Sequence, residues 1–426
     1  MKPKQETINY KREDIDKMTD EKLLELVNYH LKQCEDQDVM RQLIDERGVY
    51  QDILDASRGK RKRDYVVNTV GDDLSESALL DKEGKLMKTI RHVQLDLLVS
   101  FHSRHHEPVK IKDTSSNKER EIIKPDFANE QIVHHAIIRV ILPRLEKGMY
   151  RYTCASIPKR GISDARKHVS HIIETDIRNM KYILKIDIRH FFDSISHKVL
   201  KDKLRKIIKE KRLRELLFDI IDTTEKGLPL GFFTSQWLAN FYLQDLDHYI
   251  KERILDDCGC NTKRTGRHGA VHLIRYMDDM VITGPNKREL HKIKCRLDIV
   301  LQRDYKLRLK YDWQVFRFDH IEKDGTRKGR FLDFVGYRFY CDHVIIRKRT
   351  YKKMIKLINK MIKEGKENIS SHDASAMLSY YGIIYWSDAH GLYDKLLKPY
   401  VSLKDLKKIA KNENNSLKEL HKRSGR

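Results

Sequence analysis

Apolar residues recur along the chain with two different spacings, and the spacing changes twice. Up to about residue 90 the spacing is that of amphipathic helices in a highly charged background, for example between Leu23 and Leu31. The middle of the chain alternates short β-rich runs with helical runs, and the last part is helical again, with lysines opposite the apolar face. We therefore predict an α+β protein of three parts: a helical basic extension (1–90), a mixed part (91–345) and a basic helical part (346–426).

The mixed part contains the elements that carry the candidate chemistry. The pattern predicts buried strands over residues 182–188, 271–277 and 280–283 and an amphipathic helix over 235–250. Asp187 stands near the end of the first strand, and Asp278 and Asp279 alone separate the other two. We therefore expect a tight hairpin with both of these aspartates in its turn.

The charge of the chain indicates a polyanionic partner. Lys and Arg total 86 against 63 Asp and Glu, a formal charge of +23, and hydrophobic residues make up 40%, enough for a sizeable core. Nucleic acid is the commonest partner of such a protein. Residues 346–426 hold 19 basic and 8 acidic residues, an excess of 11 that favours a groove along a phosphate backbone. A second basic cluster, residues 58–63, is either a solvated helix end or a phosphate-contacting patch.

An anionic membrane surface is the rival partner, and the sequence argues against it. No run approaches the roughly 18 uninterrupted apolar residues of a membrane span, and the first residues lead into no apolar signal core. We expect a soluble cytoplasmic protein that does not associate with membranes.

Four residues between positions 258 and 272 form a candidate zinc set, namely Cys258, Cys260, His268 and His272. The C-x-C spacing is tighter than is usual at structural zinc sites, and His272 begins a predicted strand. We therefore favour a loop between two core elements over a zinc site. The six cysteines are too scattered for a disulfide framework.

The acidic residues suggest a metal-dependent reaction. Asp187 and the Asp278–Asp279 pair belong to strand-like runs far apart in the sequence. If those strands are neighbours in one sheet, the carboxylates converge and repel one another. Hard divalent cations relieve such repulsion, and two of them about 4 Å apart stabilise both the attacking and the leaving oxygen of a phosphoryl transfer. On spacing alone, a structural role for the Asp–Asp pair remains the alternative.

Residues from about 91 to 345 resemble the fingers and palm of bacterial reverse transcriptases, because several blocks occur in the order of that family. YILKIDIRHFFDS (182–194) resembles the first palm motif and RYMDD (275–279) the catalytic turn. The other blocks are REIIKP (120–125), QIVHHA (131–136), CASIPKRGISDA (154–165), GLPLGFFTSQWLANFYLQDLD (227–247) and FLDFVGYRF (331–339), with a thumb-like stretch over 378–386. The resemblance implies a right-hand polymerase with fingers, a palm that contains an antiparallel sheet, and a helical thumb.

The resemblance also implies roles for individual residues. Asp187, Asp278 and Asp279 become catalytic residues that hold two Mg²⁺ ions, with Mn²⁺ as a substitute and Ile188 as a further metal ligand. The implied nucleotide-binding residues are Arg120, Lys124, Phe192, Leu230, Gly231 and Gln236. The implied template- and primer-binding residues are Lys159, Arg160, Tyr276, Met277, Gly336 and Tyr337. The implied partners are template RNA, the RNA–DNA hybrid and dNTPs.

Three of these roles have a clear physical basis. Phe192 falls where the family places an aromatic ring under the sugar of the incoming nucleotide, and a ring there excludes a 2′-hydroxyl; Phe191 fits a core position better. Arg120 matches a position that neutralises the triphosphate. Gly231 lets the backbone approach the nucleotide closely.

Two departures from the family pattern bear on the biological role. Most members have Pro-Gln-Gly and Ser-Pro in the second palm block, where this chain has Leu230 before the glycine and Gln236 after Ser235. These residues resemble the reverse transcriptases of diversity-generating retroelements, which copy RNA with errors at adenines. We therefore expect error-prone copying, with a small accessory protein as partner. The alternatives are an antiphage defence reverse transcriptase and, in other classes, a catalytically silent RNA-binding protein or an RNA-making polymerase.

A further departure concerns the proton donor for the pyrophosphate that leaves. The lysine that the family places late in the palm falls on Val315. Lys310 is nearby in the sequence, and the general acid stays open at this point.

Overall fold

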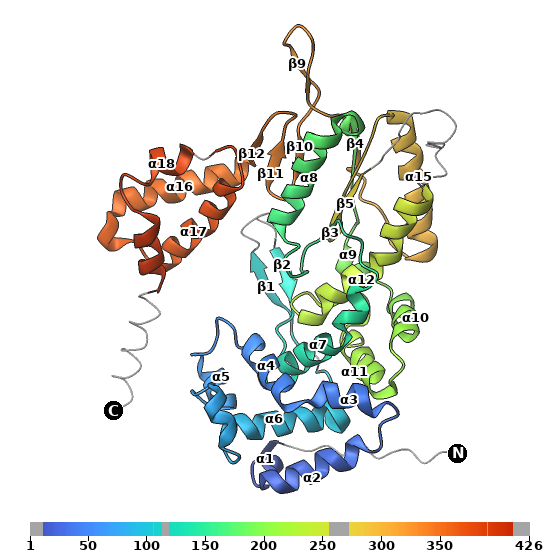
Figure 1. Cartoon of the computed structure of the whole chain (residues 1–426), viewed down its shortest axis with the longest axis vertical. Helices are drawn as coiled ribbons and strands as arrows, with labels where there is room; N and C mark the ends of the chain where they lie inside the picture. Colours follow the sequence, from blue (N-terminus) through green and yellow to red (C-terminus); the bar gives the residue numbers. More distant parts are fainter. Residues whose placement is uncertain (1–11, 105, 113–118, 255–271, 390, 412–426) are drawn as a thin grey trace. The chain divides into compact units, whose positions relative to one another are not determined.

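A computed structural model describes residues 12–104, 106–112, 119–254, 272–389 and 391–411 (Figure 1). Helices and strands both occur throughout, which confirms the α+β class. The chain divides into two compact units, of which the first comprises Met1–Ser156, Asp187–Ile254 and Cys295–Tyr311. The second comprises Ile157–Ile186, Leu255–Lys294 and Asp312–Arg426. The boundaries predicted at residues 90 and 345 stay predictions.

The first unit is mostly helical. Its elements are α1 (Arg12–Ile15), α2 (Asp20–Leu31), α3 (Gln37–Ile44), α4 (Glu46–Ala56), α5 (Asp64–Val70), η1 (Glu76–Leu80), α6 (Lys85–Leu95), η2 (Asp96–Ser100), β1 (Val109–Lys112), β2 (Glu119–Ile122), η3 (Phe127–Gln131), α7 (Ile132–Glu146), β3 (Thr153–Cys154), α9 (Phe191–Ser194), α10 (His197–Ile207), α11 (Lys211–Ile221), α12 (Phe233–Tyr249) and η5 (Ile250–Ile254). The helix predicted over residues 235–250 is confirmed as α12.

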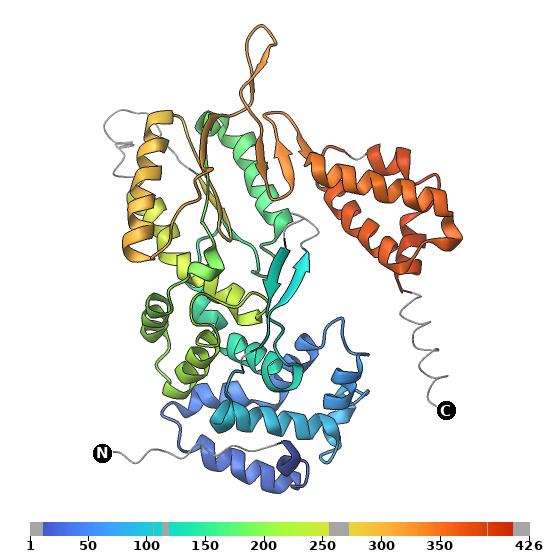
Figure 2. The ribbon, with the colours of Figure 1, turned by 180° about the vertical axis from the view of Figure 1, so that it is seen from behind.

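Side-chain caps fix where several of these helices begin. The side chains of Thr19, Asp36, Asp45 and Ser196 each accept a hydrogen bond from a first-turn N–H, in α2, α3, α4 and α10 respectively. Nearly all of α6 is buried, because α2, α4 and α5 pack against it, and α3 and α4 pack against α7 (Figure 2). The N-terminal helices and α7 therefore share one core.

The second unit contains the sheet that carries the candidate chemistry. Four strands are hydrogen-bonded neighbours in the order β5 (Leu273–Tyr276), β6 (Asp279–Gly284), β4 (Tyr182–Asp187) and β7 (Gln314–Arg317). The pairs β5–β6 and β4–β7 are antiparallel, as the resemblance implied. Helix α8 (Ile162–Asp176) packs against β5, and η4 (Ile177–Met180) packs against β6. Helix α15 (Lys287–Asp304) begins in this unit and ends in the first.

Two smaller sheets follow in the second unit. β8 (His320–Ile321) pairs with β9 (Arg327–Lys328), and β10 (Leu332–Phe334), β11 (Tyr337–Phe339) and β12 (Val344–Ile346) form an antiparallel meander. The β10–β11 turn consists of Val335 and Gly336, both with positive φ. A Cβ at Gly336 would meet no atom within 4 Å, so glycine serves the backbone conformation there and not a close contact.

The C-terminal helices of the second unit form a small core of their own. They are α16 (Lys348–Glu364), η6 (Lys366–Asn368), α17 (Ser371–Tyr385) and α18 (Gly391–Leu396), and they lie together in Figure 1. Met354, Ile358 and Met361 form the buried stripe of α16, as its apolar spacing predicted. None of the described helices combines the length and the apolar character that crossing a bilayer requires.

Candidate active site

The β5–β6 hairpin carries the Tyr-Met-Asp-Asp sequence, and its turn differs by one residue from the prediction. Tyr276 pairs with Asp279, so the two turn residues are Met277 and Asp278, whereas we expected Asp278 and Asp279. Met277 adopts a φ of +56°, and a positive φ at the first central residue suits the twist of a two-residue hairpin. Asp279 is therefore the first residue of a strand, and Asp278 is a partly exposed residue of the turn.

A buried arginine donates a hydrogen bond to the main chain of this turn. Arg275 is 0% exposed, and its Nη1 donates a hydrogen bond of 3.0 Å to the main-chain oxygen of Met277. A buried guanidinium is costly unless its donors are satisfied, so this arginine is committed to the conformation of the turn. The sequence reasoning did not single out Arg275. Its signal was a charged residue inside an otherwise apolar strand.

Asp187 lies at the end of β4. Ile183, Leu184 and Ile186 on this strand are buried, whereas Lys185 and Asp187 are partly exposed on a common face. The Nζ of Lys310 lies 2.6 Å from Asp187 Oδ2, and the main-chain N–H of Lys310 donates to the main-chain oxygen of Asp187 over 2.9 Å. Lys310 is thus the cation beside this carboxylate. Val315 on β7, the position where the family places a lysine, pairs with Leu184 on β4.

The carboxylates fit hard divalent cations. Asp187 Oδ1 is shielded from solvent and accepts no hydrogen bond from the described residues, while Oδ2 faces Lys310. A shielded carboxylate oxygen without a donor is costly, and a metal ion is one partner that removes the cost. The roles of Asp187, Asp278, Asp279 and the Ile188 carbonyl as metal ligands stay predictions.

The exposure of the two phenylalanines fits the expectation that Phe191 is a core residue and Phe192 is not. Phe191 is 3% exposed and Phe192 is partly exposed, with their ring centroids 5.6 Å apart. The main-chain oxygen of Phe192 accepts a hydrogen bond of 2.8 Å from the N–H of Leu228. A Cβ at Gly227 would lie 2.5 Å from the same oxygen, so the glycine is required for this contact. The block that begins at Gly227 therefore packs directly on the Phe192 backbone.

Gly231 has a structural neighbour that the sequence did not reveal. Its φ is +110°, and a Cβ there would lie 2.1 Å from the main-chain oxygen of Ile123. The N–H of Ile123 donates to the main-chain oxygen of Leu230 over 2.7 Å. The glycine thus allows contact with the segment that follows β2, and its predicted approach to a nucleotide stays a prediction. Arg120, Lys124 and Gln236, the predicted nucleotide-binding polar side chains, are all exposed.

The predicted template- and primer-binding residues differ in exposure. Lys159 is exposed with a φ of +64°, and Arg160 is partly exposed. Tyr276 and Met277 are partly exposed at the hairpin. Tyr337 is 2% exposed, so its ring belongs to the core, and a primer contact at that position would use the backbone.

A strongly cationic cavity lies where β10–β12 meet the start of α16. It has a volume of about 470 Å³, and its lining comprises Arg338, Arg347, Lys348, Arg349, Lys352, Lys353 and Asp333. Asp333 Oδ1 accepts a hydrogen bond of 2.6 Å from Arg347 Nε, so the one carboxylate of the lining already has a basic partner. We call this cavity the cationic pocket. Such a concentration of like charge suits phosphate groups.

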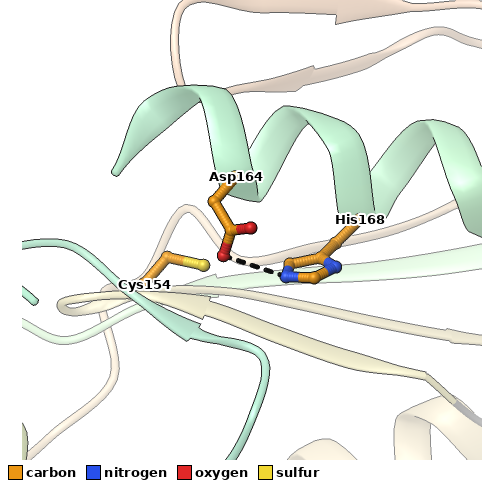
Figure 3. A group of neighbouring side chains, drawn as sticks. All are labelled: Cys154, Asp164 and His168. Atoms are coloured by element: carbon orange, nitrogen blue, oxygen red, sulfur yellow. Dashed lines mark hydrogen bonds and ion pairs between the residues drawn. The ribbon is translucent and has the colours of Figure 1, made fainter. Parts of the chain in front are cut away.

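The choice between a loop and a zinc site at residues 258–272 is largely untested. Cys258, Cys260 and His268 lie outside the described residues, while His272 Nε2 is 2.7 Å from Asp176 Oδ2. A similar pair links His168 Nε2 and Asp164 Oδ2 on α8 at 3.0 Å (Figure 3). His272 therefore has a carboxylate partner within its own unit.

Comparison with known proteins finds similarity to reverse transcriptases in the middle of the chain. Residues 130–314 match the reverse transcriptase (RNA-dependent DNA polymerase) family. Protein YkfC of Escherichia coli (strain K12) is 23% identical over 301 residues, which cover 63% of this chain and 75% of that protein. The Retron Ec73 reverse transcriptase of Escherichia coli is 24% identical over 311 residues, which cover 70% of this chain and 88% of that protein.

Solved structures that are similar to this chain include apo telomerase from Candida tropicalis truncated from the C-terminal domain. It superposes with a TM-score of 0.40 and 15% identity over 57% of this chain. The chain spans about half of that telomerase, 55% of its length. None of these similar proteins is named as a diversity-generating reverse transcriptase, so that subtype stays a prediction. The chain therefore contains a region, residues 130–314, that matches the reverse transcriptase (RNA-dependent DNA polymerase) family, and it is similar at low identity to a bacterial retron reverse transcriptase.

Proposed function

We propose that the chain copies an RNA template into DNA by two-metal nucleotidyl transfer at Asp187, Asp278 and Asp279. The observation that carries the proposal is the strand order. β4, which ends at Asp187, is the hydrogen-bonded neighbour of β6, which begins at Asp279. Carboxylates at the ends of neighbouring strands suit shared divalent cations.

In this mechanism the three aspartates and the Ile188 carbonyl would hold two Mg²⁺ ions, with Mn²⁺ as a substitute. Bound there, the ions would supply Lewis acidity to the primer 3′-hydroxyl and to the pyrophosphate that leaves. Arg275 keeps the turn in the conformation that presents Asp278, through its bond to Met277. Lys310 holds one oxygen of Asp187 and leaves the other, Oδ1, for an ion.

The remaining site residues select and hold the substrates. Phe192 excludes ribonucleotides by contact with a 2′-hydroxyl, and Arg120 with Lys124 neutralises the triphosphate. Lys159 and Arg160 contact template phosphates, and the cationic pocket holds phosphates of the RNA–DNA hybrid. An A-like hybrid is recognised by shape and phosphates rather than by sequence.

Two biological roles have support. Leu230 and Gln236 favour error-prone copying in a diversity-generating retroelement, where a small accessory protein assists. Similarity to a retron reverse transcriptase favours the second candidate, a defence-associated enzyme. Sequencing of the cDNA made by the purified protein separates them, because equal error rates at template adenines and at other bases would remove the first.

The polymerase assignment itself is tested with the Asp278→Ala/Asp279→Ala double variant. We expect it to lose incorporation of dNTPs on an RNA template while it retains its RNA affinity. Asp202→Ala is the matched control, because Asp202 is an exposed carboxylate on α10 that pairs with Arg205. Primer extension by the double variant at the wild-type rate would refute the site assignment.

A further inference from the structure

Lys185 connects three segments of the second unit. It lies on β4 between the buried residues Leu184 and Ile186, and its side chain is 29% exposed. Its Nζ donates a hydrogen bond of 2.7 Å to the main-chain oxygen of Asp333 on β10. The same Nζ is 3.5 Å from Oδ2 of Asp279, the first residue of β6. One ammonium group therefore contacts both the hairpin of the candidate active site and the β10–β11 hairpin.

We propose that Lys185 is a positioning residue that fixes the catalytic carboxylate of Asp279 and the β10–β11 hairpin relative to each other. The inference rests on the proposed function, because it treats Asp279 as a metal ligand and residues 332–339 as the segment that holds the primer end. It adds a residue to which neither the family motif nor the sequence reasoning gave a role.

The physical basis is the donor chemistry of lysine. An ammonium has three N–H donors and no acceptor, so it satisfies a carbonyl and a carboxylate at once. Its charge orients Oδ2 of Asp279 toward β10, and it offsets the repulsion between Asp279 and the neighbouring Asp278. The second contact is to a main-chain oxygen, so a movement of β10 is transmitted to the ammonium and from there to the carboxylate.

The bond to Asp333 separates positioning from simple charge balance. A lysine that only balanced charge would compete with the metal ions for Asp279, and its removal would help both metal binding and activity. A lysine that positions two segments leaves metal binding intact or tighter when it is removed, but the primer end loses its alignment. A misplacement of about 1 Å can cost on the order of 100-fold in rate.

Three variants test the proposal in the full chain. Lys185→Met keeps the aliphatic stem and removes the donors, and Lys185→Arg keeps charge and donors. Lys181→Met is the matched control, because Lys181 is an exposed lysine just before β4 whose Nζ is 5.7 Å from the Tyr182 ring. Extension of a primed RNA template is measured with separate kcat and KM for the dNTP. Mn²⁺ binding without nucleic acid is measured by calorimetry, and amide exchange of residues 332–339 is followed in the same proteins.

We expect Lys185→Met to lower kcat by about 10- to 100-fold with little change in KM for the dNTP. Mn²⁺ affinity should stay equal or rise, amide exchange of β10–β11 should accelerate, and Lys185→Arg should recover most of both losses. Lys181→Met should match the wild type. Equal behaviour of Lys185→Met and Lys181→Met would overturn the proposal, and so would loss of Mn²⁺ binding in Lys185→Met. If instead Asp278→Ala/Asp279→Ala still extends primers, the polymerase site is wrong, while the exchange result remains a separate test of Lys185.

Discussion

The candidate active site and the cationic pocket differ in the proportion of acidic and basic side chains that they contain. At the active site two carboxylates each have a cation of the same chain beside them. Lys310 contacts Asp187, and Lys185 contacts Asp279. In the cationic pocket six basic side chains surround one carboxylate, Asp333, which already binds Arg347. Paired charges serve geometry at the active site, whereas an excess of one sign around a cavity is suited to an external polyanion.

The largest expected effect comes from removing charge on the balanced side. Asp187→Asn keeps the shape of the side chain but loses a metal ligand, so primer extension should fall on the order of 1000-fold. The double variant Asp187→Asn/Lys310→Gln removes the lysine left without its carboxylate. If Asp187 acts through metal ions, the double variant remains as inactive as the single one. Recovery of activity in the double variant would mean that the Asp187–Lys310 pair is merely structural.

A steric change should leave the charge comparison untouched. Phe192→Ala opens space at the sugar of the incoming nucleotide, so the preference for dNTPs over rNTPs should fall by roughly 10- to 100-fold. The ratio of kcat/KM values for the two substrates measures this preference. Phe191→Leu is the control, because Phe191 is a core residue, 3% exposed, and its replacement should lower stability without changing the ratio. An unchanged ratio in Phe192→Ala would exclude the ring as the selective element.

Removing charge from the unbalanced side should weaken binding and not chemistry. Lys352→Ala/Lys353→Ala removes two cations from the pocket, so affinity for an RNA–DNA hybrid should fall by about 10-fold, and the log–log salt slope by roughly 1.5. Lys356→Ala/Lys363→Ala removes two exposed lysines of α16 that do not line the pocket. Equal losses in the two variants would show that α16 contributes diffuse charge, without a distinct phosphate pocket.

The sequence predicted elements that depend on local pattern. The strand that ends at Asp187, the helix observed as α12 and the β5–β6 hairpin all follow from apolar runs and apolar spacing, because most of the apolar residues of each are buried. The turn of the hairpin was off by one residue. Apolar spacing does not specify which residue adopts a positive φ, and here that residue is Met277.

Contacts between distant segments were beyond the sequence pattern. Lys185 and Lys310 act through partners that only the folded chain brings near, whereas Arg275 acts through the main-chain oxygen of Met277, two residues further on. The partners of Lys185 on β10 and of Arg275 are main-chain oxygens, which carry no sequence signal. Gly231 was predicted to let the backbone approach a nucleotide, which stays a prediction, and its observed neighbour is the backbone of Ile123, more than a hundred residues earlier. Lysines and arginines in apolar strands are the one signal that could have identified two of the three.

A buried group outside both regions gives the smallest expected effect on activity. His134 on α7 is 0% exposed, and neither ring nitrogen has a hydrogen-bond partner among the described residues. Burial lowers the pKa of His134 to about 3, and neighbouring His135 and His106 act in the same direction. Because the unfolded chain binds the proton more readily, the stability of the folded chain is complete above about pH 6.5 and falls as the pH declines.

Part of the acid sensitivity of the wild type should therefore come from this side chain. Between pH 7 and pH 5 the wild type should lose about 2 kcal/mol of unfolding free energy through His134, and His134→Leu should abolish that loss. Urea unfolding at both pH values measures the difference, with the exposed His171→Leu as control. Primer extension at pH 7 should be the same in all three proteins. An equal pH dependence in the wild type and His134→Leu would mean that other groups cause the acid sensitivity, since replacement of a buried neutral imidazole by an aliphatic group removes its titration completely.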